Sequence, residues 1–154
     1  MQVYKIQKEK YGEELSGEGA RKVGGRWNPI GVPLIYASCS ISLAILELMV
    51  NLSSFSFLED NPFHILTIDV PSISPLDEWP AETLPKGWDS SPYSYETQEM
   101  GKNWVKENRS LAVTVPSSII KQENNILINC LHKDFGRIKV ISTFPFESAK
   151  RFNK

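Results

Sequence analysis

The stretch from Ser40 to Leu52 constrains the fold most, because it is long enough for a helix and has almost no polar surface. Ser40 can act as an N-cap, since its hydroxyl can accept hydrogen bonds from first-turn N–H groups. Apolar residues recur at helical spacing and also occupy the flanks: Ile41, Leu43, Ala44, Ile45, Leu46, Leu48, Met49, Val50 and Leu52. A helix that is apolar nearly all round is predicted to be buried in the domain.

Glu47 is the only charged residue between Ile41 and Val50. Burying a lone carboxylate is costly unless it is paired, hydrogen-bonded or protonated. Two interpretations stay open. Glu47 either lies at the edge of the core with its carboxylate in solvent, or points from a rigid helix into a pocket. In the second case it would bind a ligand hydroxyl or stabilise a developing cation.

Composition indicates one ordinary globular domain over residues 1–154, with 41% hydrophobic and 23% charged residues and no internal repeat. A net charge of −1 without a basic face argues against a nucleic-acid-binding protein. No apolar run approaches the roughly 20 residues of a membrane span. Charges in the first residues do not fit a signal peptide, so the cytoplasm is the expected location. The two cysteines and two histidines show no metal-ligand spacing, and no metal is expected.

Alternating and continuous apolar runs predict strands, and a second helix is predicted around Trp104 from Thr97 to Asn108. The predicted strands cover Gln2–Gln7, Val32–Ser38, Phe63–Val70, Ser110–Val115, Asn125–Asn129 and Ile138–Ser142. Tyr11–Pro33, with six glycines and two prolines, is predicted to be mostly loop. Pro71–Tyr95 is predicted to be a long surface excursion with one short helical turn. These elements indicate an α+β domain with a mixed, mainly antiparallel sheet.

Several residues outside the long helix have side chains suited to a binding site. Gly24 and Gly25 would let the backbone approach a ligand, and the Arg26 guanidinium suits a phosphate. A glycine turn beside a surface arginine is the simpler alternative. Tyr36, at the end of an apolar run, is equally consistent with a packed ring. Ser117 has no nearby histidine or aspartate to activate it, so a hydrogen-bonding or capping role is expected rather than nucleophilic attack.

Taken in order, these motifs resemble the RES domain, which is named for its arginine, glutamate and serine. The resemblance spans essentially the whole chain, and its most specific block is GGRWN. The matching stretches are Gly17–Gly31, Tyr36–Glu47, Gly87-Trp88, Gly101…Trp104, Val115–Ser117 and Asn125–His132. One departure is Cys130, which stands where the family pattern has a proline.

The resemblance implies the toxin of a bacterial type II toxin–antitoxin pair, with a fold similar to ADP-ribosyltransferases and activity on NAD⁺. It assigns catalytic roles to Arg26, Tyr36, Glu47 and Ser117. With these residues, we predict NAD⁺-binding roles for Gly25, Arg26, Asn28, Tyr36 and Ser117. The resemblance also implies a cognate antitoxin with an Xre-like helix-turn-helix region, and either a homodimer or a hetero-oligomer with that antitoxin.

Cleaving the nicotinamide–ribose bond of NAD⁺ expels a neutral base and leaves oxocarbenium-like charge on the sugar. On this hypothesis Arg26 holds a phosphate, Tyr36 packs beside the nicotinamide end and Glu47 stabilises the cation, while Ser117 orients the nicotinamide-side ribose or amide. The acceptor of ADP-ribose is water, phosphate or a protein. A non-catalytic nucleotide-binding module is the alternative from another class. An RNase is disfavoured by the near-neutral charge.

Overall fold

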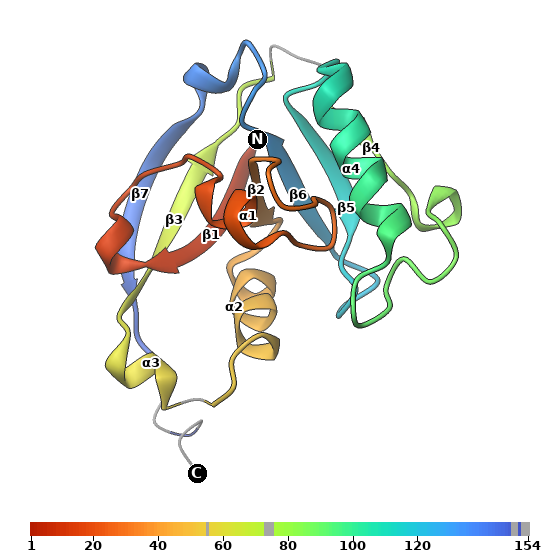
Figure 1. The fold of residues 1–154 in the computed structure, drawn as a ribbon. Coiled ribbons are helices and arrows are strands. Elements are labelled where there is room, and N and C mark those ends of the chain that lie inside the picture. Colours follow the sequence, from red (N-terminus) through yellow and green to blue (C-terminus); the bar gives the residue numbers. More distant parts are fainter. Residues whose placement is uncertain (55, 73–75, 149–150, 152–154) are drawn as a thin grey trace.

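The computed structural model describes residues 1–54, 56–72, 76–148 and 151. Within these residues the strands form one seven-stranded sheet, in the order β4-β5-β6-β2-β1-β3-β7 (Figure 1). All neighbouring strands are antiparallel except β4 and β5, which are parallel. The prediction of an α+β fold with a mixed, mainly antiparallel sheet is confirmed.

All six predicted strands are present, and the sheet contains one strand that was not predicted. The strands are β1 Gln2–Lys8, β2 Leu34–Ser38, β3 Phe63–Asp69, β4 Asp77–Glu78, β5 Ala112–Pro116, β6 Asn124–Asn129 and β7 Lys139–Phe146. The unpredicted strand is β4, which has only two residues and therefore no recognisable alternation. The last strand, β7, runs beyond the predicted Ser142 because it lies at an edge, where Pro145 need not donate a ladder hydrogen bond.

Both predicted helices form, and each begins at a serine cap. The α-helices are α1 Glu18–Val23, α2 Ile41–Val50, α3 Phe57–Asp60 and α4 Tyr95–Glu107. Short 3-10 turns cover Glu9–Tyr11, Ala81–Thr83 and Phe135–Arg137. The Ser40 hydroxyl accepts a hydrogen bond from the Leu43 N–H at 3.1 Å, and Ser94 accepts one from Thr97 at 3.3 Å. These bonds satisfy first-turn donors that would otherwise have no intrahelical partner.

The prediction that α2 is buried all round is wrong. Only Leu43 and Ala44 are buried, and Val50 is 56% exposed. In Figure 1 the helix projects beyond one end of the central strands instead of lying across the sheet. One side of α2 packs on β1 and β2, and another side lines a cleft. An apolar sequence pattern does not distinguish a core from a cleft wall, which explains the error.

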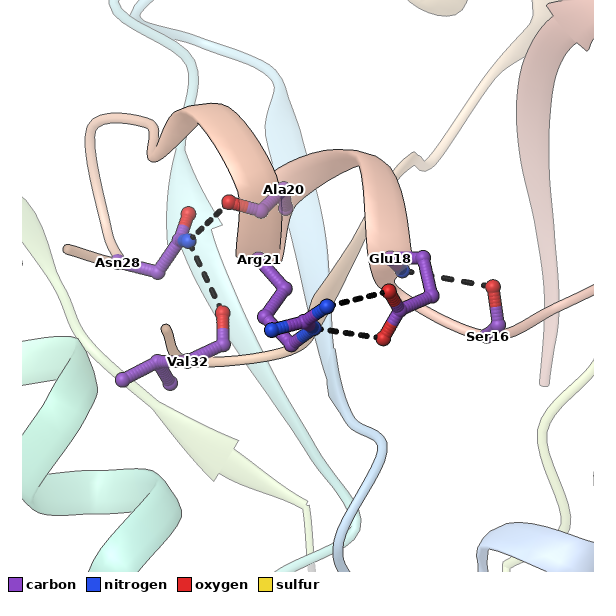
Figure 2. A network of polar contacts seen from close by, with 6 residues as sticks. All are labelled: Ser16, Glu18, Ala20, Arg21, Asn28 and Val32. Atoms are coloured by element: carbon purple, nitrogen blue, oxygen red, sulfur yellow. Dashed lines mark hydrogen bonds and ion pairs between the residues drawn. The ribbon is translucent and has the colours of Figure 1, made fainter. Parts of the chain in front are cut away.

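The glycine-rich segment also contains a helix, α1, where mostly loop was predicted. Gly17 and Gly24 flank α1 with φ angles of 69° and 74°, a backbone region that favours glycine. Inside the helix, two nitrogen atoms of Arg21 bind the two carboxylate oxygens of Glu18 at 2.7 and 2.8 Å (Figure 2). The rest of the segment is mostly loop, as predicted, and the two glycines bound the short helix.

Two apolar clusters lie on opposite faces of the sheet, because neighbouring residues of a strand point to opposite sides. On β2, Ile35 belongs to one cluster and Leu34 to the other. The second cluster includes Leu84 and Trp88, which are buried. The segment 71–95 is therefore not only a surface excursion, although it contains the predicted helical turn; residues 73–75 lie outside the described part. Across the described chain, no helix is both long and apolar enough to cross a membrane.

Candidate active site

A cleft of about 810 Å³ brings together side chains from separate parts of the chain. Arg26, Tyr36 and Glu47 all line it, together with Asp89 and Tyr93 from the segment that precedes α4. Its volume lies within the range of about 300–1,000 Å³ that is common for small-molecule and cofactor sites. The guanidinium and the solitary carboxylate singled out in the sequence thus share one cavity.

Arg26 uses part of its guanidinium to hold a wall of the cleft. Its Nη1 atom donates hydrogen bonds to the backbone oxygens of Trp88 at 2.7 Å and Ser90 at 2.8 Å. Its Cζ atom lies 5.1 Å from the centre of the Tyr93 ring, within cation–π range. No hydrogen bond joins Nε or Nη2 to any described residue. These two nitrogen atoms retain their donors for an anionic ligand.

Tyr36 fixes the backbone around Arg26. Its hydroxyl accepts a hydrogen bond from the Trp27 N–H at 2.9 Å and donates one to Asn28 Oδ1 at 2.7 Å. Burial raises the pKa of Tyr36, so the hydroxyl stays protonated. A Cβ atom at Gly25 would lie 2.6 Å from this hydroxyl, which is too close for any other residue without movement. Gly25 is therefore needed for the contact between loop and tyrosine.

Asn28 is fully buried, and its side chain is engaged within its own loop. Its Nδ2 atom donates to the backbone oxygens of Ala20 at 2.9 Å and Val32 at 3.0 Å (Figure 2). The Asn28 side chain thus ties α1 to the segment that leads into β2. Asn28 is not among the residues that line the cleft. Its contact with NAD⁺ remains a prediction.

The Glu47 carboxylate is held through one of its two oxygen atoms. Oε1 accepts hydrogen bonds from Ser117 Oγ at 2.8 Å and from Asn125 Nδ2 at 2.6 Å. Ser117 is fully buried, and its oxygen also accepts from the N–H groups of Ile119 and Ile120. No hydrogen bond from a described residue reaches Oε2. One oxygen atom is therefore anchored while the other remains able to accept a hydrogen bond from a ligand.

The structure divides the predicted site residues into two groups. Gly25, Arg26, Tyr36 and Glu47 line the cleft, whereas Asn28 and Ser117 lie behind it and support the first group. The predicted functional roles of all six remain predictions.

The cleft also contains polar side chains that had no functional role assigned from the sequence, among them Asp89, Tyr93 and Asn125. Asn125 opens a stretch that matches the RES pattern, which offered a signal, whereas the other two lie in a segment without periodicity. The Lys121 ammonium donates to Asp89 at 2.7 Å and lowers the pKa of its carboxyl. Among the residues that the structure describes, no three His, Cys, Asp or Glu side chains are grouped to hold a metal ion.

Comparison with known proteins gives matches over nearly the whole chain. A family model described as the RES domain matches residues 2–149. The Toxin Res of Photorhabdus laumondii subsp. laumondii is 39% identical, with 100% of this chain and 98% of that protein covered. The Prs ADP-ribosylating toxin of Sphingobium sp. (strain YBL2) is 36% identical, with 82% of this chain and 79% of that protein covered.

A solved structure has a similar fold. It is the toxin–antitoxin complex MbcT-MbcA of M. tuberculosis, which matches with a TM-score of 0.75 at 22% identity. The match covers 94% of this chain and 83% of that one. At this level of identity the likeness shows a shared fold.

Proposed function

The chain belongs to the RES domain family, and we propose that it is the toxin of a toxin–antitoxin pair that cleaves the nicotinamide–ribose bond of NAD⁺. The observation that carries this proposal is the shared cleft of Arg26 and Glu47. One group can bind a diphosphate, and the other can stabilise positive charge on the sugar. The relatives named as toxins support the biological role.

Arg26 would bind the diphosphate of NAD⁺ through Nε and Nη2, the two nitrogen atoms that the loop leaves free. Its other contacts, to Trp88 and Ser90, would hold the guanidinium in place before the substrate arrives. Tyr36 is engaged by Trp27 and Asn28, so its contribution would be to pack its ring beside the nicotinamide end and to support the loop. A preformed anion site of this kind loses little freedom on binding.

Glu47 would act as the electrostatic stabiliser of the reaction. When the bond between the ribose carbon and the pyridinium nitrogen breaks, its electron pair leaves with neutral nicotinamide, so that no acid is required. The positive charge that remains on the sugar is stabilised by a carboxylate fixed in advance. Oε2 would accept a hydrogen bond from a ribose hydroxyl, while Oε1 stays bound to Ser117 and Asn125. An attacking water would then complete hydrolysis and release a proton.

The direct test is incubation of the purified protein with NAD⁺ and quantification of nicotinamide and ADP-ribose by chromatography. We expect one nicotinamide to be released for each NAD⁺ consumed. When the protein is induced in a bacterial host, we expect intracellular NAD⁺ to fall. Binding of NAD⁺ without nicotinamide release would contradict cleavage and favour a non-catalytic nucleotide-binding module.

A second candidate function is transfer of ADP-ribose to a protein. The observation in its favour is the relative named as a Prs ADP-ribosylating toxin, which is 36% identical to this chain. Both activities begin with the same bond cleavage and differ only in the acceptor. Mass spectrometry of the products separates free ADP-ribose, a phosphorylated ADP-ribose and a modified polypeptide.

We further propose that residues 1–154 act as one RES domain in the cytoplasm, and that a cognate antitoxin with an Xre-like helix-turn-helix region neutralises it. The toxin–antitoxin complex with a similar fold supports an antitoxin partner. Co-expression with a candidate helix-turn-helix protein from the same host, followed by co-purification and size-exclusion chromatography, tests this. Survival of the host with the partner gene and growth arrest without it is the expected outcome.

A further inference from the structure

We propose that Asn125 positions Glu47 together with Ser117, and that Ser38 holds the Asn125 amide in place. The inference rests on the proposed function, in which the Glu47 carboxylate stabilises the sugar cation. It extends that function by identifying Asn125 and Ser38 as positioning residues, which act on the reaction only through Glu47.

The evidence begins with a directed chain of two short hydrogen bonds. The Ser38 hydroxyl donates to Asn125 Oδ1 at 2.7 Å, and Asn125 Nδ2 donates to Glu47 Oε1 at 2.6 Å. Rotating the amide by half a turn would place its carbonyl oxygen against the carboxylate, where two acceptors repel each other. The carboxylate only accepts, so it requires the NH₂ group to face Glu47, and the Ser38 hydroxyl, on a side chain that is only 4% exposed, then pairs with the amide oxygen and holds it in place.

The strand register explains why these side chains meet. Ser38 on β2 and Asn125 on β6 are directly opposite each other, and Asn125 is also opposite Val115 on β5. Residues directly opposite on neighbouring strands point to the same face and can touch. Ser117, the second donor to Glu47, follows β5 immediately. The ends of three neighbouring strands therefore converge on one carboxylate of α2.

The consequence is a carboxylate held in one conformation. A glutamate side chain has several rotatable bonds, and the exposed apolar surface of α2 provides no polar partner that would order it. Asn125 and Ser117 fix Oε1, which leaves Oε2 as the oxygen available to the cleft. Correct placement of a charged group relative to the reacting carbon has a large effect on rate.

The test compares Asn125→Ala, Asn125→Asp and the control Asn124→Ala by steady-state kinetics with NAD⁺. We expect Asn125→Ala to lower kcat by about 10- to 100-fold. The KM should change little, because Asn125 is assigned no part in binding the substrate. Asn125→Asp keeps the shape and the bond from Ser38 but puts a carboxylate against Glu47, so its kcat should fall at least as far. Asn124, the exposed neighbour, faces the opposite side and should leave kcat unchanged.

A structural measurement separates failure of this inference from failure of the proposed function. In crystal structures of Asn125→Ala and Ser38→Ala, we expect the Glu47 carboxylate to occupy more than one rotamer, whereas the wild type shows one. This readout does not require NAD⁺ cleavage, so it also applies if the wild-type protein proves inactive. An unchanged Glu47 rotamer in Asn125→Ala, or wild-type kcat in Asn125→Asp, would overturn the proposal.

Discussion

Gly101 on α4 packs directly against the backbone of Trp27, and a Cβ atom at Gly101 would overlap the Trp27 carbonyl oxygen. Gln98, on the preceding turn of α4, donates a hydrogen bond to the Gly25 oxygen at 2.9 Å. The helix therefore supports the loop that carries Arg26 from behind. The position of Arg26, the residue proposed to bind a phosphate, therefore depends on this contact between helix and loop.

This contact predicts that Gly101→Ala destabilises the protein. Alanine normally stabilises a helix interior by about 0.5–1 kcal/mol relative to glycine, so the expected loss of stability is opposite to helix propensity. Gly19→Ala is the matched control, because Gly19 also lies in a helix, α1, but a Cβ atom there would meet no other atom. Chemical denaturation should show a lower free energy of unfolding for Gly101→Ala. Equal values for the two variants would contradict the packing described.

Arg26→Lys is predicted to be nearly as damaging as Arg26→Ala. The arginine reaches two carbonyl oxygens through Nη1 and keeps two further nitrogen atoms for substrate, whereas lysine provides one nitrogen. We expect a higher KM for NAD⁺ and faster hydrogen–deuterium exchange in the loop around Ser90. Arg21→Lys, a change at an ion pair on α1, is the control and should retain the wild-type KM. Wild-type kinetics in Arg26→Lys would show that substrate binding does not require a guanidinium at this position.

Glu47→Gln should slow turnover by roughly 10²–10³-fold, by analogy with the loss of one electrostatic stabiliser. Glutamine keeps the size of the side chain but removes the negative charge that would stabilise the sugar cation. The measurement is kcat for nicotinamide release. Glu82→Gln, at an exposed position of a short turn, is the control for loss of one charge. NAD⁺ consumption at the wild-type rate in Glu47→Gln would exclude Glu47 from the mechanism.

The lowered pKa of Lys5 predicts that the stability of the protein depends on pH. Burial lowers the pKa of its ammonium group to about 8 from the ordinary 10.5. Between these values the unfolded chain binds more protons, so the contribution of Lys5 to the free energy of unfolding rises with pH. Below pH 8 the group is charged in both states, and the cost of burying its charge is fully present.

Lys5→Met should therefore be more stable than the wild type at pH 7, and the difference should shrink as the pH rises through 8 towards 10.5. Urea denaturation of both proteins across this range measures the difference. Comparing the two removes most of the opposite effect of Cys130, whose pKa burial raises to about 12, because that thiol is present in both proteins. A difference that did not vary with pH would show that the folded protein does not lower the pKa of Lys5.

Local sequence patterns were sufficient for the six longer strands and the two longer helices, but not for β4, α1 and α3 or for the contacts between elements. The helix of Glu47 could be located from apolar residues at helical spacing, and the strand of Tyr36 from a short continuous apolar run. The bond between Glu47 and Asn125 could not, because it joins residues 78 positions apart and depends on strand register. The likeness of α2 to a core helix was misleading for a related reason. Its pattern records apolar side chains and says nothing about whether protein or an open cleft lies opposite them.

Arg26 meets two demands with one side chain, since it braces the wall formed by Trp88 and Ser90 and presents its remaining nitrogen atoms to the cleft. A substitution at this position therefore changes both properties at once. A replacement that alters substrate affinity also loosens the wall, so lineages that keep the activity must keep the arginine. Cells selected to survive induction of the protein should repeatedly carry mutations in this codon.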